Sequence, residues 1–171
     1  TQRGWTEPNL VTYMESHDEQ RLMYRNSQEG NASNSAHNTR TLPVGSKRIG
    51  MAAAFWATIP GPKMMWQFGE LAYDYSINYC QDGTIKDQCR VDPKPIKWDY
   101  YSNTDRKALY NVFSKVINLR KTPAYLSTFT TGSITKDLSS AVKWMIVQDA
   151  ALKVVVYGNF DVFTKTATIN F

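Results

Sequence analysis

The chain has 171 residues, of which 42% are hydrophobic and 20% charged, a composition typical of a folded globular protein rather than a disordered one. Its 20 basic residues exceed its 15 acidic ones and give a net charge of +5, but they are scattered along the sequence. Because the basic residues form no long run, we expect neither nucleic acid nor a membrane surface as a partner. No stretch approaches about 18 consecutive apolar residues, so the sequence predicts no membrane span.

The first part of the chain predicts one strand and one long loop. Residues 1–9 are polar, and the apolar, β-prone stretch 10–14 predicts a strand. Residues 19–40 are rich in Asn and Ser and predict a long loop with a short helical turn around 22–24. Loops of this length in compact domains are usually functional or mobile.

A helix and a second strand are expected next. Gly45-Ser46 predicts a helix start, and apolar residues recur at helical spacing through 47–58. The Pro-Gly turn at 59–62 ends this helix, and the apolar stretch 63–68 predicts a strand. Strand, helix and strand in this order indicate a βαβ unit, which requires parallel strands.

The second half begins with another long loop, 70–103, and continues with a strongly amphipathic helix. Capping residues at 102–105 predict the helix start, and the helix is expected to end near Lys121, before Pro123. The periodicity then changes, and four successive strands are expected at 127–135, 141–147, 152–157 and 164–171. The last of these reaches the end of the sequence, so we expect the sheet to lack its final strands.

Two cysteines, Cys80 and Cys89, lie in the polar second loop. In a secreted protein they could form a disulfide that closes a loop of about ten residues and contributes about 2–3 kcal/mol. Free thiols are the alternative, although the apolar surroundings of buried free cysteines are missing here. Their spacing and the scarcity of His argue against a metal site.

A His17-Asp18 pair directly follows the first expected strand. In α/β barrels, catalytic side chains project from the C-terminal ends of the strands. A carboxylate at this position can stabilise developing positive charge, and His17 can hydrogen-bond a hydroxyl group. Asp18 also has a purely structural interpretation, because an Asp after a strand often caps a turn.

Four segments in order resemble the alpha-amylase family of glycoside hydrolases (family 13). They are 13–21 around His17-Asp18, 59–70 with its Pro-Gly turn and Gly-Glu pair, 90–99 (Arg-Val-Asp-Pro-Lys-Pro-Ile-Lys-Trp-Asp), and 118–126 (Asn-Leu-Arg-Lys-Thr-Pro-Ala-Tyr-Leu). Their order and approximate spacing match the family, and together they cover most of residues 9–126. The β-rich tail is compatible with the family's C-terminal domain but carries no motif.

The resemblance implies an α/β fold in two parts. Residues 1–122 would form the last two βα units of a TIM (β/α)8 barrel, and 123–171 part of an antiparallel β-sheet domain. The family's nucleophile and general acid/base come earlier in sequence and have no counterpart here. The resemblance therefore implies a fragment of a larger enzyme, whose open sheet edges can pair with other chains.

The resemblance also assigns roles to single residues. Asp18 would support the oxocarbenium-like transition state, and His17 would hydrogen-bond sugar hydroxyls. Further substrate contacts are expected from Gln20, Arg21, Glu70 and Tyr73. Glu15 and Glu19 are interpreted as supporting or solvated residues, and Trp98 as a packing anchor for the long loop. No cofactor is expected within this chain, and the family's calcium ligands would lie mostly outside it.

The implied function is retaining hydrolysis of α-glucosidic bonds in starch-like α-glucans or maltooligosaccharides, outside the cell, at the cell surface or in the periplasm. α-Glucan transferases and branching enzymes share the barrel and remain open alternatives. An alternative of another class is a non-catalytic carbohydrate-binding or structural module. Its sugar-stacking platforms would come from the aromatic residues, which make up 13% of the chain.

Overall fold

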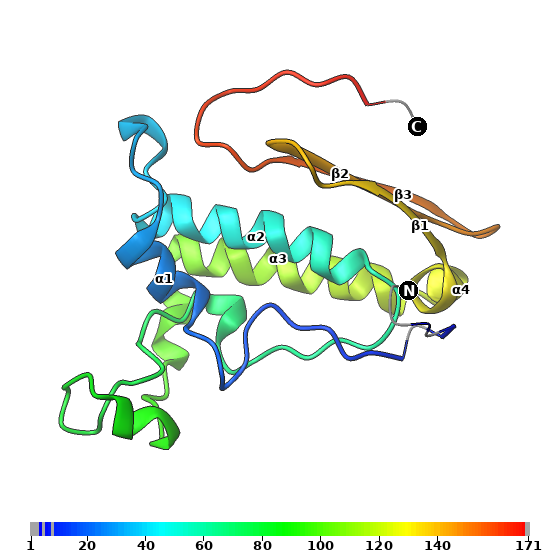
Figure 1. Cartoon of the computed structure of the whole chain (residues 1–171). Coiled ribbons are helices and arrows are strands. Elements are labelled where there is room, and N and C mark those ends of the chain that lie inside the picture. Colours follow the sequence, from blue (N-terminus) through cyan, green and yellow to red (C-terminus); the bar gives the residue numbers. More distant parts are fainter. Residues whose placement is uncertain (1–3, 5, 8, 170–171) are drawn as a thin grey trace.

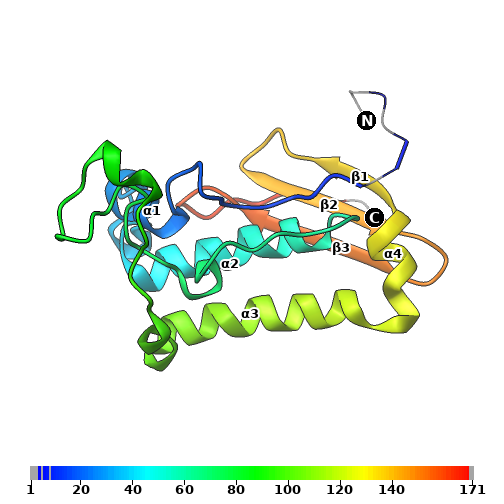
Figure 2. The same ribbon diagram turned by 90° about the horizontal axis from the view of Figure 1, so that it is seen from below.

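The computed structural model describes residue 4, residues 6–7 and residues 9–169. Two long helices, α2 (Leu42–Thr58) and α3 (Thr104–Lys121), lie side by side and run in the same direction (Figure 1). A three-stranded antiparallel sheet lies on one side of them and two extended segments on the other (Figures 1 and 2). The fold is therefore a mixture of helices and antiparallel sheet. None of the helices in the described ranges is long and apolar enough to cross a membrane.

The two long helices start and stop where local chemistry allows it. The side chain of Asn103 accepts hydrogen bonds from the backbone N–H groups of Asp105 and Arg106, as expected for a helix N-cap. The helix predicted at 47–58 begins earlier, at Leu42, because Pro43 is pre-organised for a first helical turn. It ends at Thr58, just before the proline-rich turn.

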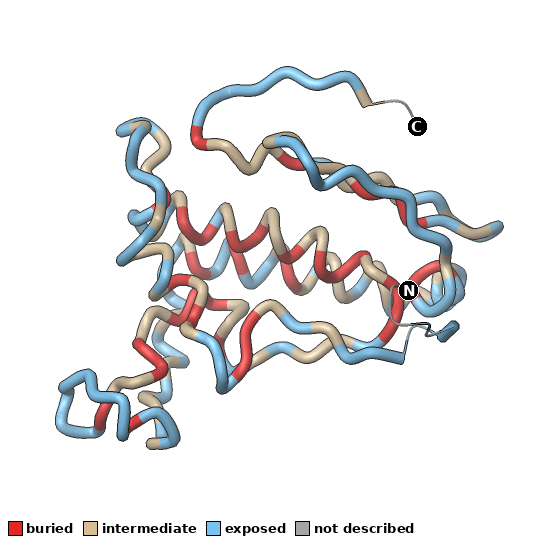
Figure 3. Tube along the Cα trace, in the orientation of Figure 1, coloured by how far each residue is buried: buried red, intermediate tan, exposed pale blue. Residues whose placement is uncertain are grey.

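The core forms where α2 and α3 pack together. Trp56 and Phe113 meet across this interface with ring centroids 6.0 Å apart. Figure 3 shows that buried residues recur along both helices. The buried members of this cluster are Met23, Ile49, Ala53, Trp56, Ala57, Ala72, Leu109 and Phe113.

The two predicted barrel strands are parallel neighbours but not regular strands. A single parallel bridge joins Thr12 and Lys63, with hydrogen bonds from Thr12 N–H to the Pro62 carbonyl and from Met64 N–H to the Thr12 carbonyl. The predictions of full strands at 10–14 and 63–68 were therefore wrong. Pro62 has no N–H to donate, and within the described residues neither segment pairs with a third one. The Trp56 indole donates to the Thr12 carbonyl and fixes this layer on α2.

The long first loop contains more helix than predicted. The expected turn at 22–24 is the beginning of α1 (Leu22–Glu29), whose buried Met23 packs into the core. Five 3-10 turns complete the helical elements of the described chain, at Ser35–His37, Gly69–Leu71, Asp87–Val91, Trp98–Ser102 and Pro123–Tyr125.

The sheet consists of β1 (Ser133–Asp137), β2 (Val142–Gln148) and β3 (Lys153–Asn159) in the order β1-β2-β3. Arg48 of α2 donates to the carbonyls of Asn159 and Asp161 at 2.8 and 3.2 Å and also to the carbonyl of Phe160. These bonds attach the end of β3 to the helical layer.

Of the strands predicted after residue 123, the one at 127–135 is right only for residues 133–135, which lie in β1, and the one at 164–171 is not found over 164–169. Residues 127–131 belong to a short helix, α4 (Leu126–Thr131), in which Phe129 is buried. The hydroxyl of Thr130 donates to the Leu126 carbonyl one turn earlier, a local bond that accommodates this β-branched residue in a helix. Residues 164–169 form no strand, since they pair with nothing in the described chain, and 170–171 lie outside the described residues.

Lys63, next to the turn before the second extended segment, should make the free energy of unfolding depend on pH. Lys63 Nζ donates to the Gly61 carbonyl at 2.8 Å, and Arg120 donates to the same oxygen at 2.7 Å. Burial, and then the nearby charge of Arg120, lower the pKa of Lys63 to about 8 from 10.5. Between these values the unfolded chain holds a proton that the folded chain has lost, so the free energy of unfolding should rise with pH.

We expect Lys63→Met to flatten this rise between pH 8 and 9.5, measured by urea unfolding at several pH values. Lys136→Met, a change at an exposed position on β1, is the matched control and should leave the slope unchanged. An unchanged slope in the Lys63 variant would contradict the shifted titration.

Candidate active-site cleft

An open cleft of about 400 Å³ lies beside the turn that follows the first extended segment. Four parts of the chain meet there: the His17-Asp18 turn, the end of the second extended segment, the start of the second loop and the segment 90–94. The residues that line it are His17, Asp18, Arg21, Trp66, Gln67, Tyr73, Ser76, Ile77, Arg90, Val91, Asp92, Pro93 and Lys94.

His17 and Asp18 both present their side chains to solvent in this cleft. The exposed fractions of the two side chains are 71% and 67%, and His17 Nε2 lies 3.5 Å from Asp18 Oδ1. The ring of Trp66 lies 5.8 Å from the imidazole, centroid to centroid. A carboxylate, an imidazole and an indole therefore face the same open space, which suits a ligand with hydroxyl groups and an apolar face.

The backbone of Asp18 is held from both sides. Its N–H donates to Ser16 Oγ at 3.1 Å, and its carbonyl accepts a hydrogen bond from the Arg90 guanidinium. Ser16 is itself buried and donates to the carboxylate of Glu19. The Asp18 carboxylate lies 3.5 Å from His17 Nε2 and 3.9 Å from Arg90, but 67% of the side chain is exposed, so it remains available to a bound ligand.

Beneath the cleft lies a buried ion pair between Glu15 and Arg21. Arg21 Nε and Nη2 donate to Glu15 Oε1 at 3.1 and 2.8 Å, and the backbone N–H of Leu22 donates to Glu15 Oε2 at 2.8 Å. Arg21 also donates to the Gln67 carbonyl and stacks over the ring of Tyr73, with 4.6 Å from guanidinium carbon to ring centroid. This pair connects the His17-Asp18 turn to the end of the second extended segment.

The remaining predicted contact residues lie around the cleft in different ways. Gln20 is not among its lining residues; its amide bonds Ser76 Oγ and the Ile77 N–H at 2.8 and 2.9 Å. Glu70 is half-buried outside the lining, and burial raises its pKa.

Tyr73 borders the cleft, yet only 1% of its surface is exposed, and its hydroxyl donates to the Pro95 carbonyl at 2.7 Å. Burial raises the pKa of Tyr73 to about 12. Trp98, expected as a packing anchor, touches Phe68 edge-on with centroids 4.8 Å apart but is 71% exposed.

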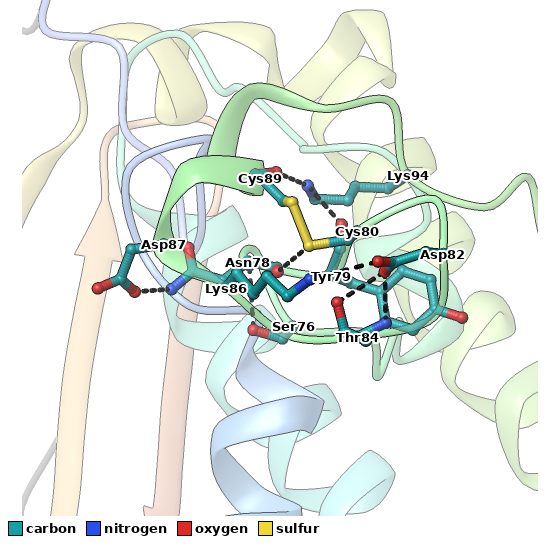
Figure 4. The surroundings of a disulfide bond; sticks show 10 residues. All are labelled: Ser76, Asn78, Tyr79, Cys80, Asp82, Thr84, Lys86, Asp87, Cys89 and Lys94. Carbon is teal, nitrogen blue, oxygen red and sulfur yellow. Dashed lines mark hydrogen bonds and ion pairs between the residues drawn. A yellow bond between two sulfur atoms is a disulfide. The ribbon is translucent and has the colours of Figure 1, made fainter.

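Cys80 and Cys89 form a disulfide (Figure 4), and the residue after Cys89, Arg90, lines the cleft. Asp82 accepts bonds from the N–H and hydroxyl of Thr84 in the loop between the cysteines, and these bonds hold the pKa of its carboxyl at about 2. Lys94 Nζ donates to the carbonyls of Tyr79 and Cys89 at 3.0 and 2.6 Å. The segment that follows Cys89 forms one wall of the cleft.

Sequence reasoning did not identify three of these contacts. Arg90 and Asp18 are 72 positions apart, and Trp66 lies in a segment interpreted only as a strand. Buried pairing of Glu15 and Arg21 also went unnoticed, although a Glu and an Arg flanking a His-Asp turn are a recognisable signal. Among the described residues, no group of three or more His, Cys, Asp or Glu side chains is placed to hold a metal ion.

Comparison with known proteins supports a fold similarity alone. No protein-family model matches the chain, and no curated protein matches it. Among solved structures, the chain is similar to Eubacterium rectale Amy13B, with a TM-score of 0.52 and 17% sequence identity. The match covers 87% of this chain but 29% of that chain, so this chain spans less than a third of its length. The fold is thus similar to part of an amylase.

Proposed function

We propose that this chain is part of an alpha-amylase-type glycoside hydrolase that cleaves α-glucosidic bonds in starch-like α-glucans or maltooligosaccharides. The observation that carries the proposal is the exposed Asp18 carboxylate beside His17 and Trp66 in an open cleft. The fold similarity to part of Amy13B and the order of the four family-like segments support it.

In this proposal Asp18 stabilises the positive charge that develops at the anomeric carbon, and His17 donates to a sugar hydroxyl. Retaining hydrolysis needs two further carboxyl groups about 5–5.5 Å apart, one as nucleophile and one as acid/base. Glu15 and Glu19 are unsuited to these roles, because the first is paired with Arg21 and the second accepts from Ser16. The one other carboxylate that lines the cleft, Asp92, cannot fill both roles, and by the family resemblance the nucleophile and acid/base would come from other strands of a larger catalytic domain.

The same proposal gives the parts of the chain their roles. Residues 1–122 would be barrel segments and 123–171 an accessory β-domain. Within the described chain, the outer edge of each extended segment is unpaired. In the larger enzyme each segment would pair along that edge with a further parallel strand, and without those strands it would pair with a second copy of the chain. The disulfide favours a secreted, cell-surface or periplasmic enzyme.

A second function, a carbohydrate-binding module without catalysis, is favoured by one observation. Glu15 and Glu19 are both engaged, and Asp92 is the one other carboxylate among the residues that line the cleft. Retaining hydrolysis needs two carboxyl groups besides Asp18, so the cleft could bind sugar without breaking a bond. A transferase or branching enzyme would use the same site with a sugar hydroxyl in place of water.

The test is reducing-sugar release from soluble starch, together with maltoheptaose binding, for this chain and for the natural polypeptide in which it occurs. Starch cleavage by the natural polypeptide is the expected result. Maltoheptaose binding without any cleavage would support the binding module. An absence of both would overturn the glycosidase proposal, and transfer of maltosyl units to an acceptor sugar would identify a transferase.

A further inference from the structure

One segment of the cleft lining follows the disulfide directly in sequence. Segment 90–94 begins directly after Cys89, and each of its five residues lines the cleft. Between the two cysteines, every residue from 81 to 88 is exposed, whereas Cys80 and Cys89 are buried. This loop therefore has no apolar core of its own, and the disulfide restricts its conformations instead (Figure 4).

The functional consequence of this attachment runs through Arg90. Its guanidinium donates to the backbone carbonyl of Asp18, and both residues line the cleft. Its distance of 3.9 Å to the Asp18 carboxylate, with both side chains well exposed, makes the direct ion pair weak. Arg90 thus holds the main chain at Asp18 through its carbonyl, Ser16 holds it through its N–H, and the carboxylate stays exposed.

We propose that the Cys80–Cys89 disulfide acts as a clamp that positions Arg90 on the Asp18 carbonyl and thereby fixes the orientation of the Asp18 carboxylate towards sugar. Arg90 is a positioning residue in this inference. The part that concerns sugar rests on the proposed function, whereas the part that concerns the Asp18 backbone does not.

Lys94 alone cannot replace the clamp. Its ammonium group bridges the carbonyls of Tyr79 and Cys89, one residue before Cys80 and at Cys89 itself. This charge is partly desolvated, and burial lowers its pKa. Once the disulfide is cleaved, the exposed residues 81–88 gain many conformations, and a few surface hydrogen bonds offset only part of that entropy.

The first experiment is NMR spectroscopy of the full 171-residue chain before and after reduction with dithiothreitol. The reagent delivers two electrons and two protons, becomes a cyclic disulfide, and leaves Cys80 and Cys89 as thiols. We expect the Asp18 carbonyl carbon signal to shift on reduction. Arg90→Gln should cause the same shift in the oxidised chain, and reduction of that variant should add nothing at Asp18, as a thermodynamic cycle requires.

Controls separate the clamp from general unfolding. Signals of β2 and β3, distant from the loop, should not change on reduction. The double variant Cys80→Ser/Cys89→Ser should reproduce the reduced chain, and Lys86→Met, which removes only a surface pair with Asp82, should leave the Asp18 signal unchanged. The inference would be overturned if reduction left the Asp18 signal of the natural chain unchanged, or if reduction shifted the Asp18 signal of the Arg90→Gln chain as far as it shifts that of the natural chain.

The second experiment measures maltoheptaose affinity by titration. We expect binding about tenfold weaker after reduction, as for the loss of one charge-assisted hydrogen bond, and no effect of reduction on the Arg90→Gln chain. If the oxidised chain binds no maltoheptaose, the sugar-binding role fails with the proposed function. The Asp18 carbonyl signal then still decides whether the clamp exists.

Discussion

Arg21→Met is expected to lower the free energy of unfolding by about 3–5 kcal/mol, because it leaves the buried Glu15 carboxylate without its partner. Only 3% of the surface of Arg21 and 6% of that of Glu15 are exposed. The substitution also removes the bond to the Gln67 carbonyl and the contact with the Tyr73 ring. Thermal unfolding should show a decrease in Tm of roughly 10 °C for a chain of this size.

A neighbouring arginine provides the matched control. Arg25 forms an exposed pair with Glu29 one helical turn away, at 3.1 Å. Arg25→Met should therefore cost less than about 0.5 kcal/mol. Replacing both members of the buried pair, Glu15→Gln with Arg21→Met, should recover part of the loss, since the uncompensated charge is then gone. Equal costs for the two arginine variants would contradict the buried-pair interpretation.

The position of this pair explains its importance for the cleft. Glu15 lies just before the His17-Asp18 turn, and Arg21 lies just after it. The pair closes the turn at its base, and the Leu22 N–H bond to Glu15 joins the turn to the start of α1. Loss of this pair should therefore change the conformation of the Asp18 turn more than that of the β-sheet.

Local signals in the sequence predicted the two long helices well. Asn103 lies among the residues expected to cap α3, and the Pro-Gly turn stops α2 where expected. These features depend on a few neighbouring residues, so no tertiary information was needed. β2 and β3 also follow their predicted ranges closely, because alternation and turn residues are local as well.

Features that depend on distant partners could not be predicted in the same way. The stretch around Phe129 has strand-like composition, yet it folds as α4 because the buried ring and the hydroxyl bonds of its threonines favour a helix there. The segments at 10–14 and 63–68 carry apolar strand patterns but share only one bridge, since a regular strand requires neighbours on the sheet. The contact between Arg90 and Asp18 depends on the whole path of the second loop.

Asp18→Asn is expected to lower kcat for soluble starch by about 100- to 1,000-fold in the natural polypeptide, with a small change in KM. The amide keeps the size of the side chain and leaves the backbone bonds to Ser16 and Arg90 in place. It lacks the negative charge that would stabilise the oxocarbenium-like transition state, an interaction stronger there than in the ground state. Steady-state kinetics with reducing-sugar detection measure the effect.

Asp137→Asn, the same chemical change at the end of β1, is the control and should leave kcat unchanged. Because Asp18 is exposed, its substitution should also leave the thermal unfolding curve nearly unchanged, which separates a lost charge from a lost fold. If the Asp18→Asn enzyme keeps more than about a tenth of its kcat, the Asp18 carboxylate does not stabilise the transition state. The cleft would then be better explained as a sugar-binding surface, in which His17 and Trp66 contact the ligand and no bond is broken.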